Sequence, residues 1–383
     1  MRNRVENRKI INIVYITLIV LILFSNLFSA QLNIVFKSYP DISKTSNTRV
    51  HFVDVGQGDA IAISFSNGKT MLVDSGTIQY RNKLTRYLDK IVLNKTKVID
   101  YLVLTHSDSD HLSNMEYIVD NYKINTFYRP PIYIEEENKI PYTNSIDYKS
   151  LINKLKSKDI NVEFSVSGSE ILDDNISIKW LYPDINDLYG YTNEAFNNLS
   201  SVILINDNGN KLLLTGDIDS TIETALINLY GDELLDIDVL KLAHHGSKNS
   251  TSELFLNTTT PNIAVACVGE NTFGHPSNET IDRILTYDRI NNTNLIESFY
   301  TTKDKGNIVL TLNNEIKVNF IKNIDDYSFC PYFVYTLIAV VFLLYFMIIP
   351  YIKYWIEKRH RIKFNKNYIK HKQNKTKPIK SGF

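Results

Sequence analysis

Hydrophobic positions in the middle of the chain fall into short apolar runs that alternate with longer segments of helical spacing. Runs of about four to eight residues rich in β-branched and aromatic side chains predict strands, and longer stretches with apolar positions every three or four residues predict helices. The expected strands are 49–55, 61–65, 70–73, 98–104, 176–181, 200–206, 211–214, 238–242 and 262–268, and the expected helices are 81–93, 220–230 and 278–287. Two successive runs of strands followed by helices indicate a layered α/β fold, with two sheets inside and helices outside.

Two further segments are apolar on every side. Residues 10–28 contain no charged side chain, and neither do residues 332–352. At about 1.5 Å per residue, either segment as a helix crosses a hydrocarbon core about 30 Å thick, which predicts two transmembrane helices. A cleaved secretory signal is the alternative for the first segment, but its apolar run exceeds the usual length of about 7–15 residues, which favours an uncleaved anchor.

Charge is distributed unevenly, although the 42 basic and 42 acidic side chains balance. Residues 1–9 and 353–383 together hold 15 of the Lys and Arg and 2 of the Glu, which leaves 27 basic against 40 acidic side chains, a net charge of −13, between them. Because the basic clusters lie on the outer side of each apolar segment, both termini are expected in the cytoplasm and the middle of the chain outside it. The basic C-terminal tail is expected to fix this topology and to touch anionic lipid, rather than to bind nucleic acid.

These features predict a two-pass protein of the cell membrane with one extracytoplasmic folded region. The expected parts are a cytoplasmic N-terminus at 1–9, a transmembrane helix at 10–29, a linker at 30–48, a folded domain at 49–322, a transmembrane helix at 331–352 and a basic cytoplasmic tail at 353–383.

Histidines and aspartates gather where three of the predicted strands end. They are His106, Asp108, Asp110 and His111 after the strand 98–104, Asp217 after 211–214, and His244 and His245 after 238–242. One histidine after a strand is usually an ordinary surface residue. Three clusters at strand ends favour a metal centre, because loops at one rim of packed sheets meet in space and divalent metals select imidazole and carboxylate ligands.

Six motifs occur in order along the chain. They are VHFVDVGQGDA at 50–60, LVDSG at 72–76, THSDSDHL at 105–112, LLTGD at 213–217, AHHGSK at 243–248 and FGHPS at 273–277. With them the sequence resembles, over roughly 49–320, the metallo-β-lactamase superfamily of hydrolases, and within it the extracytoplasmic domain of ComEC-type DNA-uptake competence proteins. The resemblance implies a four-layered αβ/βα sandwich that holds one or two metal ions between its sheets.

The resemblance also implies a set of metal ligands. It places His106 and Asp108 on a first metal, Asp110, His111 and His244 on a second, and Asp217 between them; His245 is the alternative to His244. The superfamily loop reads His-x-His-x-Asp-His, and Asp108 stands where its second histidine would be. The superfamily's third histidine on the first metal has no counterpart, since residues 196–201 offer only Asn198 and hydroxyl groups. A carboxylate at Asp108 makes the first site harder, so manganese becomes competitive with zinc.

Further polar residues are expected around this centre. Asp110 orients a metal-bound hydroxide, and His245 and His275 are candidates to donate a proton to the leaving group or to bind a phosphate oxygen. For His275, a turn residue that only packs is an equally good interpretation.

Other residues are given structural roles. Asp74 is expected to orient the metal loop by accepting backbone hydrogen bonds, and Asp54, Gln57 and Asp59 are expected to support the same region. His51 is expected only to pack.

Three functions fit these observations. The first is a metal-dependent phosphodiesterase acting on DNA, as the resemblance implies; the acidic middle of the chain stands against it, because phosphate binding normally uses clustered Lys and Arg. The second is a hydrolase of an envelope phosphodiester or small ester, and the third is a non-catalytic tethered binding module. The chain carries neither a polytopic membrane domain nor an oligonucleotide-binding domain of the competence channels, so a membrane-tethered hydrolase is expected rather than a channel.

Overall fold

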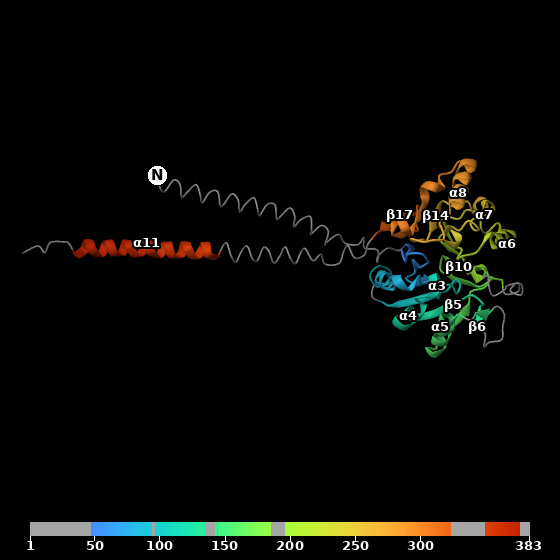
Figure 1. Ribbon diagram of the computed structural model, residues 1–383, viewed down its shortest axis with the longest axis horizontal. Coiled ribbons are helices and arrows are strands. Elements are labelled where there is room, and N and C mark those ends of the chain that lie inside the picture. The colour runs from blue at the N-terminus through green and yellow to red at the C-terminus, as the bar shows by residue number, and fades with distance from the viewer. Residues whose placement is uncertain are drawn as a thin grey trace, which may run out of the picture. The chain divides into compact units, whose positions relative to one another are not determined.

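The computed structural model describes residues 47–93, 96–134, 142–143, 145–184, 196–322 and 349–375. The chain forms two compact units. One is Pro40–Ile324, and the other combines Met1–Tyr39 with Asp325–Phe383. All described strands lie in the first unit (Figure 1).

The first sheet of this unit has eight strands in the order β17-β16-β1-β2-β3-β4-β5-β8. Neighbours are antiparallel from β17 to β3 and parallel from β3 to β8. Its strands are β1 (Arg49–Phe52), β2 (Ile61–Ser64), β3 (Thr70–Val73), β4 (Val98–Val103), β5 (Lys123–Arg129), β8 (Asn161–Phe164), β16 (Asn307–Thr311) and β17 (Lys317–Ile321).

The second sheet has seven strands in the order β15-β14-β13-β12-β11-β10-β9. It is antiparallel from β9 to β12 and parallel from β12 to β15. Its strands are β9 (Glu170–Asp173), β10 (Ile176–Tyr182), β11 (Val202–Asp207), β12 (Asn210–Leu214), β13 (Val239–Lys241), β14 (Ile263–Ala266) and β15 (Phe299–Thr301). A separate two-stranded sheet pairs β6 (Tyr133–Ile134) with β7 (Tyr142–Thr143).

The two large sheets pack face to face, and helices cover their outer faces. Strand β11 shows how the sequence produces these layers: Ile203 and Ile205 join the core between the sheets, whereas Val202 and Leu204 pack with the helices on the other side. A strand buried on both faces needs an unbroken apolar run, which is what 202–205 provides. The longer helices described in this unit are α2 (Arg81–Tyr87), α4 (Met115–Asn121), α5 (Ile146–Ser157), α6 (Ser220–Tyr230), α7 (Glu253–Thr259) and α8 (Asn278–Asn291), with a five-residue π-helical turn (Leu88–Val92) after α2. Two short helices are α3 (Ser109–Leu112) and α9 (Thr302–Lys305).

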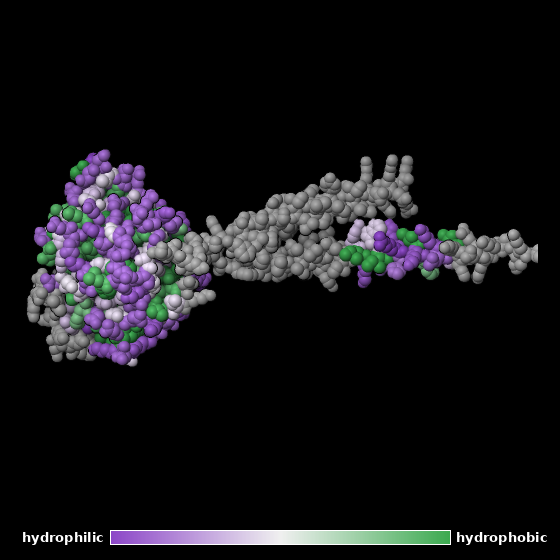
Figure 2. Space-filling view, turned by 180° about the vertical axis from the view of Figure 1, so that it is seen from behind, coloured by the Kyte–Doolittle hydropathy of each residue, from purple (hydrophilic) through white to green (hydrophobic). Residues whose placement is uncertain are grey.

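This arrangement confirms the layered fold with two inner sheets. Figure 1 shows α4 and α5 beside the first sheet and α6, α7 and α8 beside the second, which gives the four-layered αβ/βα order. Hydrophilic side chains dominate the visible surface of this unit (Figure 2), in keeping with a core enclosed between the layers. The expected strand at 70–73 and the expected helix at 220–230 are confirmed without any shift of their ends.

Most of the two predicted transmembrane segments lies outside the residues that the structure describes. Residues 10–29 lie outside the described residues, and so do 331–348 of the second segment. Within the described part of the chain, no helix combines the length and the apolar character that crossing a membrane requires. The helix α11 (Ile349–Lys375) takes up the end of the second segment and most of the basic tail.

Candidate metal centre

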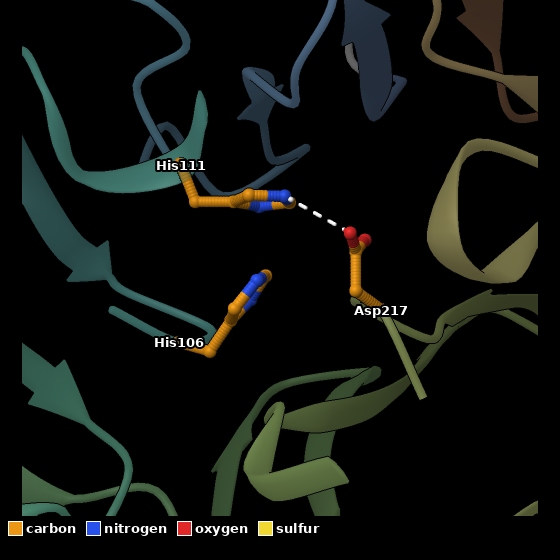
Figure 3. A group of neighbouring side chains, drawn as sticks. All are labelled: His106, His111 and Asp217. Atoms are coloured by element: carbon orange, nitrogen blue, oxygen red, sulfur yellow. Dashed lines mark ion pairs between the residues drawn. The ribbon is translucent and has the colours of Figure 1, made fainter. Parts of the chain in front are cut away.

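The three predicted ligand clusters come together at one rim of the two sheets. Parallel strands bring their carboxyl ends to the same edge, so the loops after β4, β12 and β13 meet there. Figure 3 shows His106, His111 and Asp217 pointing toward one another, although 106 residues of sequence separate Asp217 from His111. His106 and His111 are fully buried and Asp217 is nearly so. The clustering inferred from strand ends is therefore confirmed.

Asp74 holds the His111 ring in a single orientation. One Asp74 carboxylate oxygen lies 2.7 Å from His111 Nδ1, and the carboxylate also accepts bonds from the Thr105 backbone N–H (2.8 Å) and hydroxyl (2.6 Å). The expected hydrogen bond from the backbone of this loop to Asp74 is thereby confirmed. With Nδ1 bonded to Asp74, His111 Nε2 faces the centre, buried and without a hydrogen-bond partner, 3.4 Å from an Asp217 oxygen.

His106 is oriented in a similar way. Its Nδ1 lies 3.1 Å from the Thr105 hydroxyl and 3.3 Å from the Ser200 hydroxyl, and its buried Nε2 has no hydrogen-bond partner. Ser200 also accepts a 3.0 Å hydrogen bond from the Asp217 N–H, so one hydroxyl touches two candidate ligands. Burial and the neighbouring His111 lower the pKa of His106 to about 3. The ring is therefore neutral at pH 7, which is the form that binds metals.

Of the neighbours His244 and His245, the His245 ring is buried and the His244 ring is partly exposed. His245 donates from Nδ1 to the Cys267 carbonyl at 2.7 Å, and its Nε2 lies 3.2 Å from both Asp110 and Asp217. His244 Nε2 is 3.8 Å from Asp217, and its side chain is 31% exposed. A ring whose Nδ1 is bound to a carbonyl presents Nε2 as a ligand atom. The geometry thus brings His245, rather than the expected His244, into the cluster.

The charges of the cluster suit a cation. Burial alone would lower the pKa of His111, but the Asp217 and Asp74 carboxylates outweigh burial and raise this pKa well above its usual value. Burial would likewise raise the pKa of Asp110, whereas the neighbouring His111 and the hydrogen bond from His245 hold it below its usual range. The Asp110 carboxylate is therefore ionised, which is the form that binds a divalent ion. His111 would have to lose one proton before its Nε2 could bind the ion.

Ligand atoms in the described residues form four groups that could hold an ion, each within 4.8 Å. These are His106 with His111 and Asp217, Asp110 with His111 and His245, Asp59 with Asp74 and His111, and Asp59 with Asp217 and His245. The orphaned Nε2 atoms of the buried His106 and His111 fit a metal, because buried nitrogens are otherwise hydrogen-bonded. Among the described residues, Asp108 and His244 belong to none of these groups; their roles as ligands stay predictions.

Asp108 and His275 lie at the edge of the cluster. The Asp108 side chain is 48% exposed and lies 3.9 Å from His106 Nε2. The His275 ring is 5.3 Å from the His244 ring and 6.4 Å from the His245 ring. Its loop is pinned by Asn271, whose side chain accepts from the His275 N–H (3.0 Å) and donates to the His275 carbonyl (2.8 Å). His275 thus lies beside His244 at the edge of the cluster.

The loop after β1 closes the back of the centre. A Cβ on Gly58, whose φ is +136°, would come within 2.4 Å of the Asp110 carbonyl oxygen, so only glycine fits there. The Asp59 N–H donates to that carbonyl at 3.2 Å. The other loop residues are peripheral, since Asp54 pairs with Lys83 at 2.5 Å and Gln57 accepts from a backbone N–H at 3.4 Å.

Three further residues support the centre without having been singled out from the sequence: Thr105, Ser200 and Lys241. The signal for Lys241 was available, because it is a charged residue inside the apolar run 239–243. It is fully buried, with its Nζ 2.6 Å from Asp59. His51, in contrast, is buried against Tyr87 and away from the inter-sheet core, which confirms its packing role.

The fold and this cluster define a class of protein. The family model described as "Metallo-beta-lactamase superfamily" matches residues 53–270, and the chain belongs to that superfamily. It has the hydrolase fold of the superfamily together with candidate metal-binding residues.

Within the superfamily the chain is similar to ComEC-type competence proteins, which confirms the resemblance. It is 24% identical over 261 residues to ComE operon protein 3 of Bacillus subtilis, covering 64% of this chain and 31% of that protein. It is 28% identical over 242 residues to Recombination protein 2 of Haemophilus influenzae, covering 62% and 26%, and 28% identical over 256 residues to Competence protein ComA of Neisseria gonorrhoeae, covering 65% and 31%. The chain therefore spans less than a third of the length of these relatives.

Proposed function

We propose that this protein is a membrane-tethered, metal-dependent phosphodiesterase that acts on DNA outside the cytoplasm. The observation that carries the proposal is the pair of buried Nε2 atoms of His106 and His111, which make no hydrogen bond and lie beside the carboxylate of Asp217. Buried polar atoms without partners are rare in folded proteins, and a ligated ion would satisfy both nitrogens.

The ligand set is assigned on these contacts. His106, Asp108 and Asp217 would hold a first ion, and Asp110, His111, His245 and Asp217 would hold a second, with His245 in the place first given to His244. Manganese or zinc fits this mixture of imidazole and carboxylate. When bound, such ions lower the pKa of a coordinated water and stabilise negative charge on a phosphoryl oxygen.

The remaining residues of the site act on the substrate. Asp110 would accept a hydrogen bond from the attacking water, since its side chain is 28% exposed. His275 and His244 lie next to each other beside the cluster, with their rings 5.3 Å apart. A neutral imidazole there can bind a phosphate oxygen through its N–H or pass a proton to the leaving oxygen. His275 keeps the role expected of it, and His244 joins it in place of the buried His245.

Membrane tethering rests on the two uncharged segments and the basic ends. Helix α11 carries Tyr351, Tyr354 and Trp355 in its first turns and Lys or Arg along the rest. Aromatic side chains followed by basic ones are typical of the cytoplasmic membrane interface, which supports a cytoplasmic C-terminus. Protease added to intact cells should digest the Pro40–Ile324 unit and leave a tag after Phe383 protected; digestion of that tag would contradict the topology.

A second candidate is a hydrolase of an envelope phosphodiester or small ester. The observation that favours it is the net charge of −13 in the middle of the chain, because an acidic surface repels a DNA backbone. A non-catalytic binding module is disfavoured, since the cluster combines several ligand groups with the supporting bonds of Asp74 and Ser200.

The proposal is tested with the full chain in detergent, first by metal analysis and then by hydrolysis assays with Mn²⁺ or Zn²⁺. Single-stranded DNA and a small phosphodiester are the two substrates, and chelated protein is the control. Cleavage of DNA that is lost on chelation supports the proposal. Cleavage of the small diester alone selects the second candidate, and protein that binds no metal contradicts both.

A further inference from the structure

A fully buried lysine lies directly behind the candidate bridging ligand. Lys241 ends strand β13, has no exposed surface, and belongs to neither of the two ligand sets assigned above. Its Nζ lies 2.6 Å from Asp59 Oδ2, 2.9 Å from the Gly216 carbonyl and 3.4 Å from Asp217 Oδ1. An ammonium group has three donors, and these three oxygens take all of them. A buried charge with this many partners is held in a fixed position.

The two carboxylate oxygens of Asp217 have different partners because one of them contacts Lys241. Oδ1 faces the ammonium, whereas Oδ2 lies 3.4 Å from His111 Nε2 and 3.2 Å from His245 Nε2. The carboxylate torsion of aspartate is intrinsically soft, so nothing in the side chain itself would keep the oxygens in these places. The ammonium supplies that restraint, because rotation of the carboxylate would cost it the contact with Oδ1.

The same ammonium lies within a group of atoms that could attract a metal. Asp59, Asp217 and His245 form one of the four candidate groups, and Lys241 already pairs with both of its carboxylates. Two carboxylates and one carbonyl surround the Lys241 ammonium, so all three of these neighbours are acceptors. A positive charge in this position opposes a dication on the Asp59 side.

We propose that Lys241 is a positioning residue that holds Oδ1 of Asp217, so that Asp217 presents Oδ2 alone to the metal centre. The lysine thereby keeps metal on the side of His106 and Asp110 and excludes it from the side of Asp59. This inference rests on the proposed metal centre. The competing explanation is that Lys241 only compensates the buried charge of Asp59, with no effect on how Asp217 meets a metal.

The two explanations are separated by removing the lysine together with its partner. Lys241→Met alone would leave the buried Asp59 without its closest cationic partner, which destabilises folds severely. The double variant Lys241→Met/Asp59→Asn removes both charges and keeps the volumes similar. Asp59→Asn alone is the matched control, because it retains the contact between Lys241 and Asp217.

The measurements use the full chain loaded with Co²⁺, after circular dichroism has shown that each variant is folded. The visible absorption of Co²⁺ reports its coordination number, and calorimetry gives the affinity for Co²⁺. In the double variant Oδ1 is free to become a second ligand atom, so we expect weaker absorption from a higher coordination number. Affinity should fall by roughly 10–100-fold, the usual cost of losing a residue that orients a ligand. The Asp59→Asn variant retains the contact between Lys241 and Asp217, so it should absorb more strongly and bind Co²⁺ more tightly than the double variant does.

Two results would overturn the inference. A folded double variant with the native spectrum and affinity would show that Lys241 only compensates Asp59. An Asp59→Asn variant with the altered spectrum would assign the effect to Asp59 instead. A wild-type protein that binds no Co²⁺, Mn²⁺ or Zn²⁺ would contradict the proposed metal centre itself, which is a different failure.

Discussion

Replacing Asp74 by asparagine should damage the metal centre through the His111 ring. The carboxylate accepts three hydrogen bonds, two from Thr105 and one from His111 Nδ1 at 2.7 Å. The amide of asparagine has the same shape, but only its oxygen accepts. If that oxygen keeps the bond to the Thr105 N–H, the amide NH₂ faces His111 Nδ1, which must give up its proton. The proton then sits on Nε2, the atom that should bind the metal.

The size of the effect follows from these bonds. Loss of a residue that orients a metal-binding histidine costs roughly 10–100-fold in metal affinity, or about 1.4–2.7 kcal/mol. Hydrogen bonds to a charged group contribute about 1.5–3 kcal/mol each to stability, so the metal-free Asp74→Asn protein should also unfold more easily. The first effect is specific to metal, and the second is not.

Calorimetric titration with Mn²⁺ and Zn²⁺ measures the affinity, and urea denaturation with chelator measures the stability. Asp54→Asn is the matched control, since Asp54 belongs to the same opening loops but pairs with Lys83 instead. That variant should bind metal as the wild type does. Native metal affinity in a folded Asp74→Asn protein would refute the role given to Asp74 and, with it, the assignment of Nε2 of His111 as a ligand atom.

Three other predictions test separate parts of the account. His51 is buried, and burial and the nearby Arg49 lower its pKa from 6.5 to about 3; the unfolded chain therefore binds the extra proton, and stability should fall by about 1.4 kcal/mol per pH unit below pH 6.5. Urea denaturation of chelated His51→Gln protein between pH 4.5 and 6.5 should show a slope smaller by that amount, and equal slopes would contradict it. Phe273 is 73% exposed with its ring 5.8 Å from His275, so it is placed to stack on a nucleobase. Phe273→Ala should raise KM for single-stranded DNA about fivefold or more, from a stacking energy of about 1–3 kcal/mol, and should leave KM for an abasic oligonucleotide unchanged; an equal change for both would refute stacking. Asp108→His should keep metal but shift the affinity ratio from Mn²⁺ towards Zn²⁺, since imidazole is the softer donor; an unchanged ratio in calorimetry would mean that Asp108 does not touch the metal.

The strands and helices that could be predicted from the sequence are those with a clear local pattern of apolar and polar residues. The apolar run 202–205 and the helix 220–230 are examples, because each is fixed by burial on faces that the local sequence already defines. Helix α5 was missed, although Ser145 caps it and its buried residues recur with helical spacing. The strand expected over 49–55 ends at Phe52, because the chain turns there towards Gly56, whose φ is +70°.

The candidate site was predictable as a set of residues but not as a geometry. Motifs at strand ends located the cluster, since parallel strands bring such ends together. Which of His244 and His245 turns inward depends on two consecutive left-handed residues, with φ of 49° and 54°, and on the carbonyl of Cys267. Neither the left-handed backbone nor the position of the Cys267 carbonyl can be predicted from the local pattern of residues. The place of Lys241 likewise depends on Asp59, which is 182 residues away along the chain.

The central claim is that Asp110 and its neighbours in the loop after β4 would bind a metal ion on which hydrolysis depends. The most direct measurement compares wild-type and Asp110→Asn full-length protein for bound Mn²⁺ and for Mn²⁺-dependent cleavage of single-stranded DNA. An amide lacks the charge that holds a dication and orients its water, so the variant should bind metal more weakly and lose cleavage. Full cleavage by a folded Asp110→Asn protein would contradict the account.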